Sequence, residues 1–513
     1  MKKERVFLLH PFLFAVYPVI ALFIHNKKEL MFSVVFIPII LLLLLTVFLL
    51  LSVFLVFKNH QKTAAIVSVF WILLFSYYHF CSILKGFYLQ ILNFPIGPGK
   101  FILLCFFIIF LGFASLVKKG RNLTNLTRFL NIFVSFLFLF LLLAIVFPKG
   151  NEALEKQKEE LNLTGLTQSV LIKKPNIYYI ILDAYARSDI LKEVYNYDNS
   201  NFINYLAKKG FYIANKSRSN YHTTTLSIPS SLNLQYLANP EYSWAVDYNV
   251  FRLLKQLGYK TAVITSGKDL LNIKRVDVYK MFGLKLRLND FQAELINLTP
   301  IRSLTPLSRA VFKGFYSTHR KRIIYVFDAL KDTVNWEPPY FIFAYLFSPH
   351  PPFVFGPKGE EIQPNRPFNT KDSTDFILSG GTKDEYIQGY KDQVEFINVK
   401  LMDFIDHILT ISEEPPIIVL QGDHGPRSMV NWKNFDKTYW KEPYSILNAY
   451  YFPDKDYSNL YESISPVNTF RVIFNLYFNA GYILLEDKSY CWDLKDRSCL
   501  IDVTDRINDA SAQ

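Results

Sequence analysis

Acidic and imidazole side chains follow three apolar segments in the second half of the chain, at the point where each segment ends. These side chains are Asp183, His350, Asp423 and His424. Aspartate and histidine are the ligands that a divalent cation of borderline hardness prefers. Asp183 alone would be read as a turn residue or a helix cap, which are common after strands. The adjacent Asp423 and His424 stand between two glycines and suit a pair of metal ligands better than a core contact, so the set predicts a metal site.

Residues 219–233 hold the candidate nucleophile. Three consecutive threonines, 223–225, precede an apolar-periodic stretch that is able to open a helix. A hydroxyl at a helix N-terminus lies among free backbone N–H groups at the positive end of the helix dipole, which stabilises an alkoxide and also binds a phosphate or sulfate. The plainer interpretation is a Ser/Thr N-cap, which is common. The Asp and His candidates elsewhere in the chain favour the chemical interpretation.

The candidate residues are carried by elements of two alternating kinds. Continuous runs of β-branched and aromatic residues indicate strands buried on both faces, and apolar residues at helical spacing indicate amphipathic helices. The predicted strands cover 176–182, 260–265, 340–347 and 416–421. The predicted helices cover 201–209, 250–257 and 385–409. This alternation predicts an α/β domain with a mostly parallel central sheet flanked by helices, in which ligands bind at the carboxyl ends of the strands.

Five uncharged apolar runs fill the first third of the chain, at 6–24, 30–57, 64–84, 101–117 and 129–147. A helix needs roughly 20 apolar residues to cross the hydrocarbon core of a membrane. The first run follows basic residues as a signal peptide does, but no small-residue cleavage site comes after it, and we interpret it as a retained anchor. We therefore predict a transmembrane region of five helices over 1–148, a linker over 149–174 and the α/β domain over 175–513.

The net charge of +12 lies entirely in the apolar part of the chain. Residues 1–150 hold 14 Lys and Arg and two Glu, whereas the remainder holds 42 basic and 42 acidic residues. The excess is a membrane-topology signal rather than a nucleic-acid-binding face, so we expect no nucleic-acid partner. If the N-terminus is cytoplasmic, nine basic residues fall on the cytoplasmic side and four in the opposite loops. An odd number of spans then places residues 175–513 outside the cytoplasm.

Two cysteines, Cys491 and Cys499, lie eight positions apart in the exported part of the chain. An oxidising compartment would allow them to pair and close the C-terminal segment. Two unpaired thiols would give the same sequence pattern, so both states remain open at this point.

Taken together, these residues resemble the alkaline phosphatase/sulfatase superfamily. They are most similar to its membrane-anchored branch, which includes lipoteichoic acid synthases and phosphoethanolamine transferases, and the resemblance covers about two-thirds of the chain from Pro175 onward. It implies that Asp183, Asp423 and His424 bind one divalent cation, zinc or manganese, with magnesium or calcium as alternatives. Synthases and transferases usually carry Glu at the first of these positions, so Asp183 departs from their pattern.

The same resemblance implies that Thr224 is the nucleophile and contributes its oxygen to the metal. The family places a Ser three residues after its Thr, and Thr224 is followed by Ser227 at that spacing. Thr225 is the nearest competitor, and Thr223 lacks a Ser at that spacing. The candidates for substrate binding are His350, Arg427 and His222.

The resemblance implies a membrane-anchored transferase, integral to a bacterial plasma membrane. It would move a phosphoglycerol or phosphoethanolamine headgroup from a lipid donor to a cell-envelope acceptor through a phospho-threonine intermediate. A phosphodiesterase or sulfuric-ester hydrolase of the same superfamily is the alternative, and a non-catalytic membrane scaffold is a distant third. A formylglycine-dependent sulfatase is disfavoured, because Thr224 stands where a Cys or Ser would mature and Ile228 where an Arg would follow.

Overall fold

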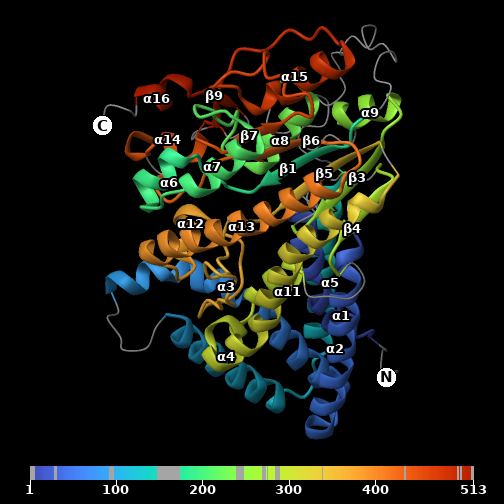
Figure 1. Cartoon of the computed structure of the whole chain (residues 1–513). Helices are drawn as coiled ribbons and strands as arrows, with labels where there is room; N and C mark the ends of the chain where they lie inside the picture. Colours follow the sequence, from blue (N-terminus) through green and yellow to red (C-terminus); the bar gives the residue numbers. More distant parts are fainter. Residues whose placement is uncertain are drawn as a thin grey trace. The chain divides into compact units, whose positions relative to one another are not determined.

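The computed structural model divides the chain into two compact units (Figure 1). The first unit consists of Met1–Lys156 and Leu288–Phe315, and the second of Gln157–Arg287 and Tyr316–Gln513. The structure describes residues 6–27, 32–91, 98–146, 174–237, 248–267, 273, 275–283, 289–337, 339–431, 435–493, 496 and 499–509. The predicted linker at 149–174 lies, but for its last residue, outside the described residues.

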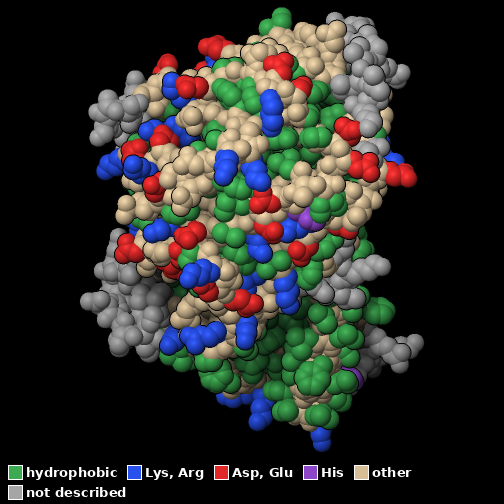
Figure 2. Space-filling view, in the orientation of Figure 1, with side chains coloured by type: hydrophobic (Ala, Val, Ile, Leu, Met, Phe, Trp, Pro, Cys, Tyr) green, Lys and Arg blue, Asp and Glu red, His purple; other side chains and the backbone are tan. Residues whose placement is uncertain are grey.

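Long apolar helices make up most of the first unit. They are α1 (His10–His25), α2 (Phe36–Phe57), α3 (His60–Ile91), α4 (Pro98–Lys119) and α5 (Thr124–Val146). Among the described residues, four segments are long and apolar enough to cross a membrane, and they correspond to α2, α3, α4 and α5. Hydrophobic side chains cover much of the surface around α1, α2 and α5 (Figure 2). Such lengths and compositions are those of an integral membrane protein.

The first predicted span is shorter than expected. The apolar run covers 6–24, but α1 has only 16 residues and begins at His10. At 1.5 Å per residue this is about 24 Å, against a hydrocarbon core of about 30 Å. The helix begins there because a proline stands in its first turn and Asn131 Oδ1 accepts the backbone N–H of His10. The structure therefore supports four spans, and the fifth stays a prediction.

The second unit is built on a seven-stranded sheet with the strand order β2-β7-β6-β1-β5-β3-β4. Its strands are β1 (Ile177–Leu182), β2 (Tyr212–Ile213), β3 (Lys260–Thr265), β4 (Val278–Met281), β5 (Tyr340–Leu346), β6 (Ile417–Gly422) and β7 (Asn448–Tyr451). Neighbours from β6 to β4 are parallel, whereas β7 is antiparallel to both β6 and β2. The four predicted strands are β1, β3, β5 and β6, so the prediction of a mostly parallel sheet is confirmed.

Helices cover both faces of this sheet (Figure 1). The helices of the second unit include α6 (Ser188–Tyr195), α7 (Ser200–Lys209), α8 (Thr224–Asn233), α9 (Asn249–Gln256), α12 (Ser373–Leu378), α13 (Lys383–Ile411), α14 (Lys441–Tyr444), α15 (Pro466–Phe478) and α16 (Thr504–Asp509). Tyr179 shares a buried apolar cluster with residues of α8, α9 and α15. The preceding residue, Tyr178, points to the other face and contacts Phe404 of α13. Because successive side chains of β1 enter two different cores, the strand is apolar throughout.

The C-terminal cysteines do not pair. The structure, which describes both residues, joins Cys491 and Cys499 by no disulfide. Cys491 lies in β8 (Tyr490–Trp492), opposite Ile501 of β9 (Leu500–Asp502), and is buried in a small apolar cluster. Cys499 is exposed just before β9. The pairing of β8 with β9, rather than a disulfide, therefore holds this C-terminal segment together.

Candidate metal centre

The ends of two neighbouring strands bring the predicted metal ligands together. β1 pairs in parallel with β6, and Leu182 lies opposite Gly422 at the last step of the ladder. Asp183 therefore follows one strand and Asp423 follows its neighbour, at the same edge of the sheet. The carboxyl edge of a parallel sheet is where ligands bind in open α/β folds.

Two glycines allow the main chain to pass closely at this edge. A Cβ added to Gly422 would lie 2.5 Å from the carbonyl oxygen of Tyr185. A Cβ added to Gly425 would lie only 2.0 Å from the carbonyl oxygen of Glu442. Any side chain at either position would push backbone apart, so close approach explains why glycines flank the Asp-His pair.

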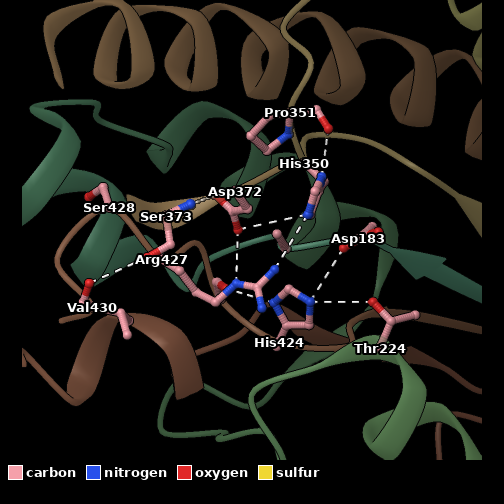
Figure 3. Close-up of polar contacts among 12 residues, drawn as sticks. Asp183, Thr224, His350, Pro351, Asp372, Ser373, His424, Arg427, Ser428 and Val430 are labelled. Carbon is pink, nitrogen blue, oxygen red and sulfur yellow. Dashed lines mark hydrogen bonds and ion pairs between the residues drawn. The ribbon is translucent and has the colours of Figure 1, made fainter. Parts of the chain in front are cut away.

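Three buried side chains, Asp183, Asp423 and His424, converge at this edge. Figure 3 shows two of them, with the ring of His424 directed towards Asp183. His424 Nε2 lies 3.5 Å from Asp183 Oδ1 and 3.6 Å from Asp423 Oδ2. One ligand atom from each of the three side chains lies within 4.8 Å of the other two. All three side chains are at most 2% exposed.

The protons of the imidazole show which of its atoms is available. His424 Nδ1 lies 2.8 Å from the carbonyl oxygen of Gly425, which is only able to accept a hydrogen bond, so Nδ1 carries the proton. The neutral ring then presents the lone pair of Nε2 to the two carboxylates. A backbone hydrogen bond on one ring nitrogen is the usual way in which a protein orients a metal-binding imidazole.

Each carboxylate likewise uses one oxygen in hydrogen bonds and leaves the other oxygen available. Asp423 Oδ1 accepts the backbone N–H groups of Ala184 and His424, and Asp183 Oδ2 accepts the hydroxyl of Tyr345. Their other oxygens, Asp183 Oδ1 and Asp423 Oδ2, are buried and accept no hydrogen bond within the described part of the chain. Burial and the charge of Asp423 raise the pKa of Asp183 well above its usual range. Two buried carboxylate oxygens without a donor, next to an imidazole nitrogen, fit a divalent cation.

One threonine hydroxyl reaches this cluster. Thr224 is the first residue of α8, and its Oγ1 lies 3.3 Å from His424 Nε2. Thr223 is the extended residue before the helix, and its hydroxyl lies 3.5 Å from that of the half-buried Thr225. Of the three threonines, Thr224 is therefore the one whose oxygen the structure brings to this cluster.

His350 and Arg427 lie beside Asp183 and His424 in a second cluster (Figure 3). The ring centroid of His350 lies 6.5 Å from that of His424. His350 Nδ1 donates to the carbonyl oxygen of Pro351 at 2.6 Å, and Arg427 Nη2 lies 3.5 Å from its Nε2. Burial lowers the pKa of His350 to about 3, so the ring is neutral at pH 7 and its Nε2 is an acceptor.

Asp372 completes the second cluster and was missed in the sequence. Its Oδ2 accepts Arg427 Nε at 2.9 Å, and its Oδ1 accepts the hydroxyl of Tyr386 at 2.6 Å. Burial acts to raise the pKa of Asp372, but the charge of Arg427 and the hydrogen bonds from Tyr386 and Arg427 outweigh burial and hold it well below its usual range. Asp372 is also the cap of the short helix α12, and that is the only role its sequence context signals.

His222 occupies a different environment from the other candidates. It is buried, with its ring edge-on to Trp492 at a centroid distance of 4.5 Å and tilted against Tyr444 at 6.3 Å. Burial, together with the charge of Arg427, holds its pKa well below its usual range. These contacts place the ring of His222 between the aromatic rings of Trp492 and Tyr444, outside the cluster of Asp183, Asp423 and His424.

The Sulfatase family profile matches residues 175–470, which is more than half of the chain, and the chain belongs to this family. The predicted membership in the alkaline phosphatase/sulfatase superfamily is thereby confirmed, and the four apolar helices agree with its membrane-anchored branch. No curated protein matches the chain by sequence.

Several solved structures are similar to the chain at low identity. The C-terminal periplasmic domain of EcEptC from Escherichia coli is 13% identical with a TM-score of 0.44, covering 66% of this chain and 94% of that one. The integral membrane protein lipooligosaccharide phosphoethanolamine transferase A (EptA) from Neisseria meningitidis is 13% identical with a TM-score of 0.40, covering 91% and 94%. The phosphonate monoester hydrolase of Agrobacterium radiobacter is 11% identical with a TM-score of 0.42, covering 62% and 80%.

Proposed function

We propose that the protein is a membrane-anchored, metal-dependent transferase. It moves a phosphoglycerol or phosphoethanolamine headgroup from a lipid donor to a cell-envelope acceptor through a phospho-threonine intermediate. The observation that carries this proposal is the convergence of the Thr224 hydroxyl on a buried set of two carboxylates and one imidazole.

The cation would be held by the three acceptor atoms described above and by Thr224 Oγ1. Zinc or manganese is favoured, because the set includes an imidazole, whereas magnesium and calcium prefer oxygen ligands in larger number. A bound divalent cation lowers the pKa of a hydroxyl that it contacts and offsets the charge of a phosphoryl group.

Thr224 performs the first transfer. Its Oγ forms a bond to phosphorus while the bond from phosphorus to the lipid alkoxide breaks, and the hydroxyl proton ends on the released lipid alcohol. An acceptor hydroxyl then attacks the phospho-threonine, and its proton returns the Thr224 side chain to the alcohol. The neutral His350, whose Nε2 is an acceptor, takes this second proton from the acceptor hydroxyl and then gives it to the Thr224 oxygen.

Positive groups around the site bind the oxygens of the phosphoryl group. The first turn of α8 offers backbone N–H groups next to Thr224. Arg427 uses its Nε for Asp372, and its other N–H groups are directed to the same region as His350 (Figure 3). Donors that are held in place before the reaction stabilise the charge that develops in a phosphoryl transfer.

Membrane attachment suits a lipid donor, because tethering raises the effective concentration of the site at the bilayer surface. We infer that the protein is integral to a bacterial plasma membrane with residues 175–513 outside the cytoplasm. The charge bias between the loops supports this orientation.

A hydrolase of the same superfamily would use the same residues with water as the acceptor. Product analysis separates the two reactions: the full-length protein in proteoliposomes is incubated with headgroup-labelled phospholipid, with and without candidate glycan or lipid acceptors. Acceptor-dependent transfer of the label supports the transferase, and release of free labelled headgroup at the same rate with any acceptor supports the hydrolase.

The nucleophile is tested by mass spectrometry of the same reaction mixtures. We expect the peptide that contains Thr224 to gain the mass of the phospho-headgroup. We expect Thr224→Ala to abolish both the adduct and turnover while the metal content stays largely intact, because the two carboxylates and the imidazole remain. Thr225→Ala, which removes the neighbouring hydroxyl, is the matched control and should keep both. An adduct at another residue, or turnover by Thr224→Ala, would reject this mechanism.

A further inference from the structure

A segment that lies between two strands of the sheet in the sequence belongs to the unit of apolar helices. Leu288–Phe315 follows β4 and precedes β5, yet it groups with the first unit. Its first helix, α10 (Asp290–Asn297), buries Phe291 and Leu295 in the apolar cluster that also contains Trp71 of α3. The chain therefore returns to the membrane-spanning helices after the first half of the sheet.

Polar contacts hold the next turn of this segment against α3 and α4. The hydroxyl of Tyr77 lies 2.6 Å from Ser303 Oγ and also donates to the carbonyl oxygen of Gly99 at 2.9 Å. A Cβ at Gly99 would lie 2.6 Å from Ser303 Oγ, so the glycine permits this approach. The guanidinium of Arg302 lies 4.7 Å from the ring centroid of Tyr78. These contacts hold residues 300–303 at the surface of the helices.

The following helix, α11 (Thr305–Asp332), has two distinct faces where it begins. Ser308, Phe312 and Phe315 are buried at helical spacing. The other face is exposed and carries Pro306, Leu307, Arg309, Ala310 and Lys313. Just before the helix, Leu304 is 38% exposed, and Leu307 is 46% exposed. The exposed face thus combines apolar and basic side chains.

The charge of this region has one sign. No acidic residue occurs in the sequence between Glu294 and Asp328. Within the first unit, this stretch contributes three basic side chains: Arg302, Arg309 and Lys313. An amphipathic surface with apolar and basic residues is typical of helices that lie in the interface of an anionic membrane.

We propose that residues 301–313, the basic segment, form a docking surface for the anionic phospholipid headgroups of the bilayer. Leu304 and Leu307 would enter the boundary between headgroups and acyl chains, and Arg309 and Lys313 would bind lipid phosphates with their stems along the apolar surface. A bilayer is favoured as the occupant because the basic segment belongs to the same compact unit as four helices that are able to span a bilayer. This docking is independent of the catalytic reaction.

The charge is tested with Arg309→Gln/Lys313→Gln in the full-length protein. Native mass spectrometry measures retention of phosphatidylglycerol and of phosphatidylcholine in a lipid titration. Each basic group near a membrane surface contributes enough that we expect phosphatidylglycerol to bind roughly 10- to 30-fold more weakly, with phosphatidylcholine unchanged. The matched control is Lys358→Gln/Lys383→Gln, which removes two exposed charges from the second unit. Equal affinities for wild type and the first variant would overturn the proposal.

The apolar contact is tested by photo-cross-linking in nanodiscs that contain phosphatidylglycerol. A benzophenone amino acid in place of Leu307 should yield lipid adducts, and one in place of Ile483, which is 83% exposed in the second unit, should not. Absence of adducts at position 307 would overturn the proposal even if the protein is fully folded and active. Binding of soluble polyphosphate that depends on Arg309 and Lys313, without lipid adducts, would instead identify a soluble polyanion and also overturn it.

Discussion

Two clusters of acidic and imidazole side chains lie next to each other at the edge of the sheet, and they differ in one respect. The metal cluster consists of Asp183, Asp423 and His424. The arginine cluster consists of Asp372, His350 and Arg427. The acidic and imidazole side chains of both clusters are buried, but only the arginine cluster contains a positive side chain, that of Arg427.

The pKa values of the two buried aspartates show the consequence. Burial and a neighbouring carboxylate raise the pKa of Asp183, whereas for Asp372 the guanidinium of Arg427 overcomes burial and lowers the pKa. The two pKa values move in opposite directions because a guanidinium lies beside Asp372 and a second carboxylate lies beside Asp183. Within the described residues, the chain places a cation in the arginine cluster and none in the metal cluster.

The largest effect is expected from a change in the metal cluster. Asp423→Asn should reduce kcat roughly 10³-fold or more, because a metal ligand is lost. Elemental analysis should show much less than the one cation per chain expected of wild type. With the cation removed by a chelator, the variant should melt no lower than wild type, since the substitution removes a carboxylate that repels Asp183. Full metal content in Asp423→Asn would contradict the assignment.

A smaller effect is expected from the arginine cluster. Arg427→Met should lower kcat/KM roughly 10²-fold, because a positioned donor to the phosphoryl oxygens is lost while the metal ligands remain. Elemental analysis distinguishes the clusters: the variant should keep its cation. Loss of the cation with Arg427→Met would show that the two clusters act as one.

Asp372→Asn should act mainly through Arg427. It would leave a largely buried guanidinium, 15% exposed, without its counter-charge, which costs about 3 kcal/mol of stability. We expect a lower melting temperature and a loss of activity of about 10-fold, which is smaller than the loss expected for Arg427→Met. The double variant Asp372→Asn/Arg427→Met should recover most of the melting temperature. If it is no more stable than Asp372→Asn alone, the ion pair is not the cause.

The smallest effect concerns Glu442, which fixes the loop that carries Arg427. Its carboxylate accepts the backbone N–H groups of Ser428 and Met429, and burial raises its pKa from 4.5 to about 7. The folded state favours the protonated form of Glu442. Its contribution to the free energy of unfolding is therefore fully present below pH 4.5 and is lost as the pH rises towards 7, by about 3 kcal/mol at most. Melting curves between pH 4.5 and 7.5 should show a smaller decline for Glu442→Gln than for wild type. An equal decline in both would assign the pH dependence to another group.

The positions of the metal cluster were predictable because they follow from periodicity. β1, β5 and β6 are buried on both faces, so each appears as a continuous apolar run whose end is visible in the sequence, and a parallel sheet aligns those ends. Asp183 and Asp423 then needed no further information to be placed together. The role of Tyr345 was not predictable, because this residue lies within the apolar run of β5. Its hydroxyl nevertheless donates a hydrogen bond to Asp183.

The partners of the arginine cluster were not predictable as a set. Asp372 and Arg427 are 55 positions apart, and Asp372 follows no strand. Its local context signals only a helix cap, and nothing in the residues around Arg427 identifies its counter-charge. A contact between a loop and a turn depends on how the whole edge is packed, which local propensity does not encode.

The sequence by itself determined the alternation of strands and helices, four of the five predicted membrane spans and the positions of the residues in the metal cluster, because burial on a regular element leaves a regular pattern of residue types. Tertiary structure alone decided that α1 begins at His10, that Cys491 and Cys499 stay apart, that Asp372 holds Arg427, and that residues 288–315 join the apolar helices. Each of these depends on which distant surfaces meet, and a contact between distant surfaces has no period along the chain.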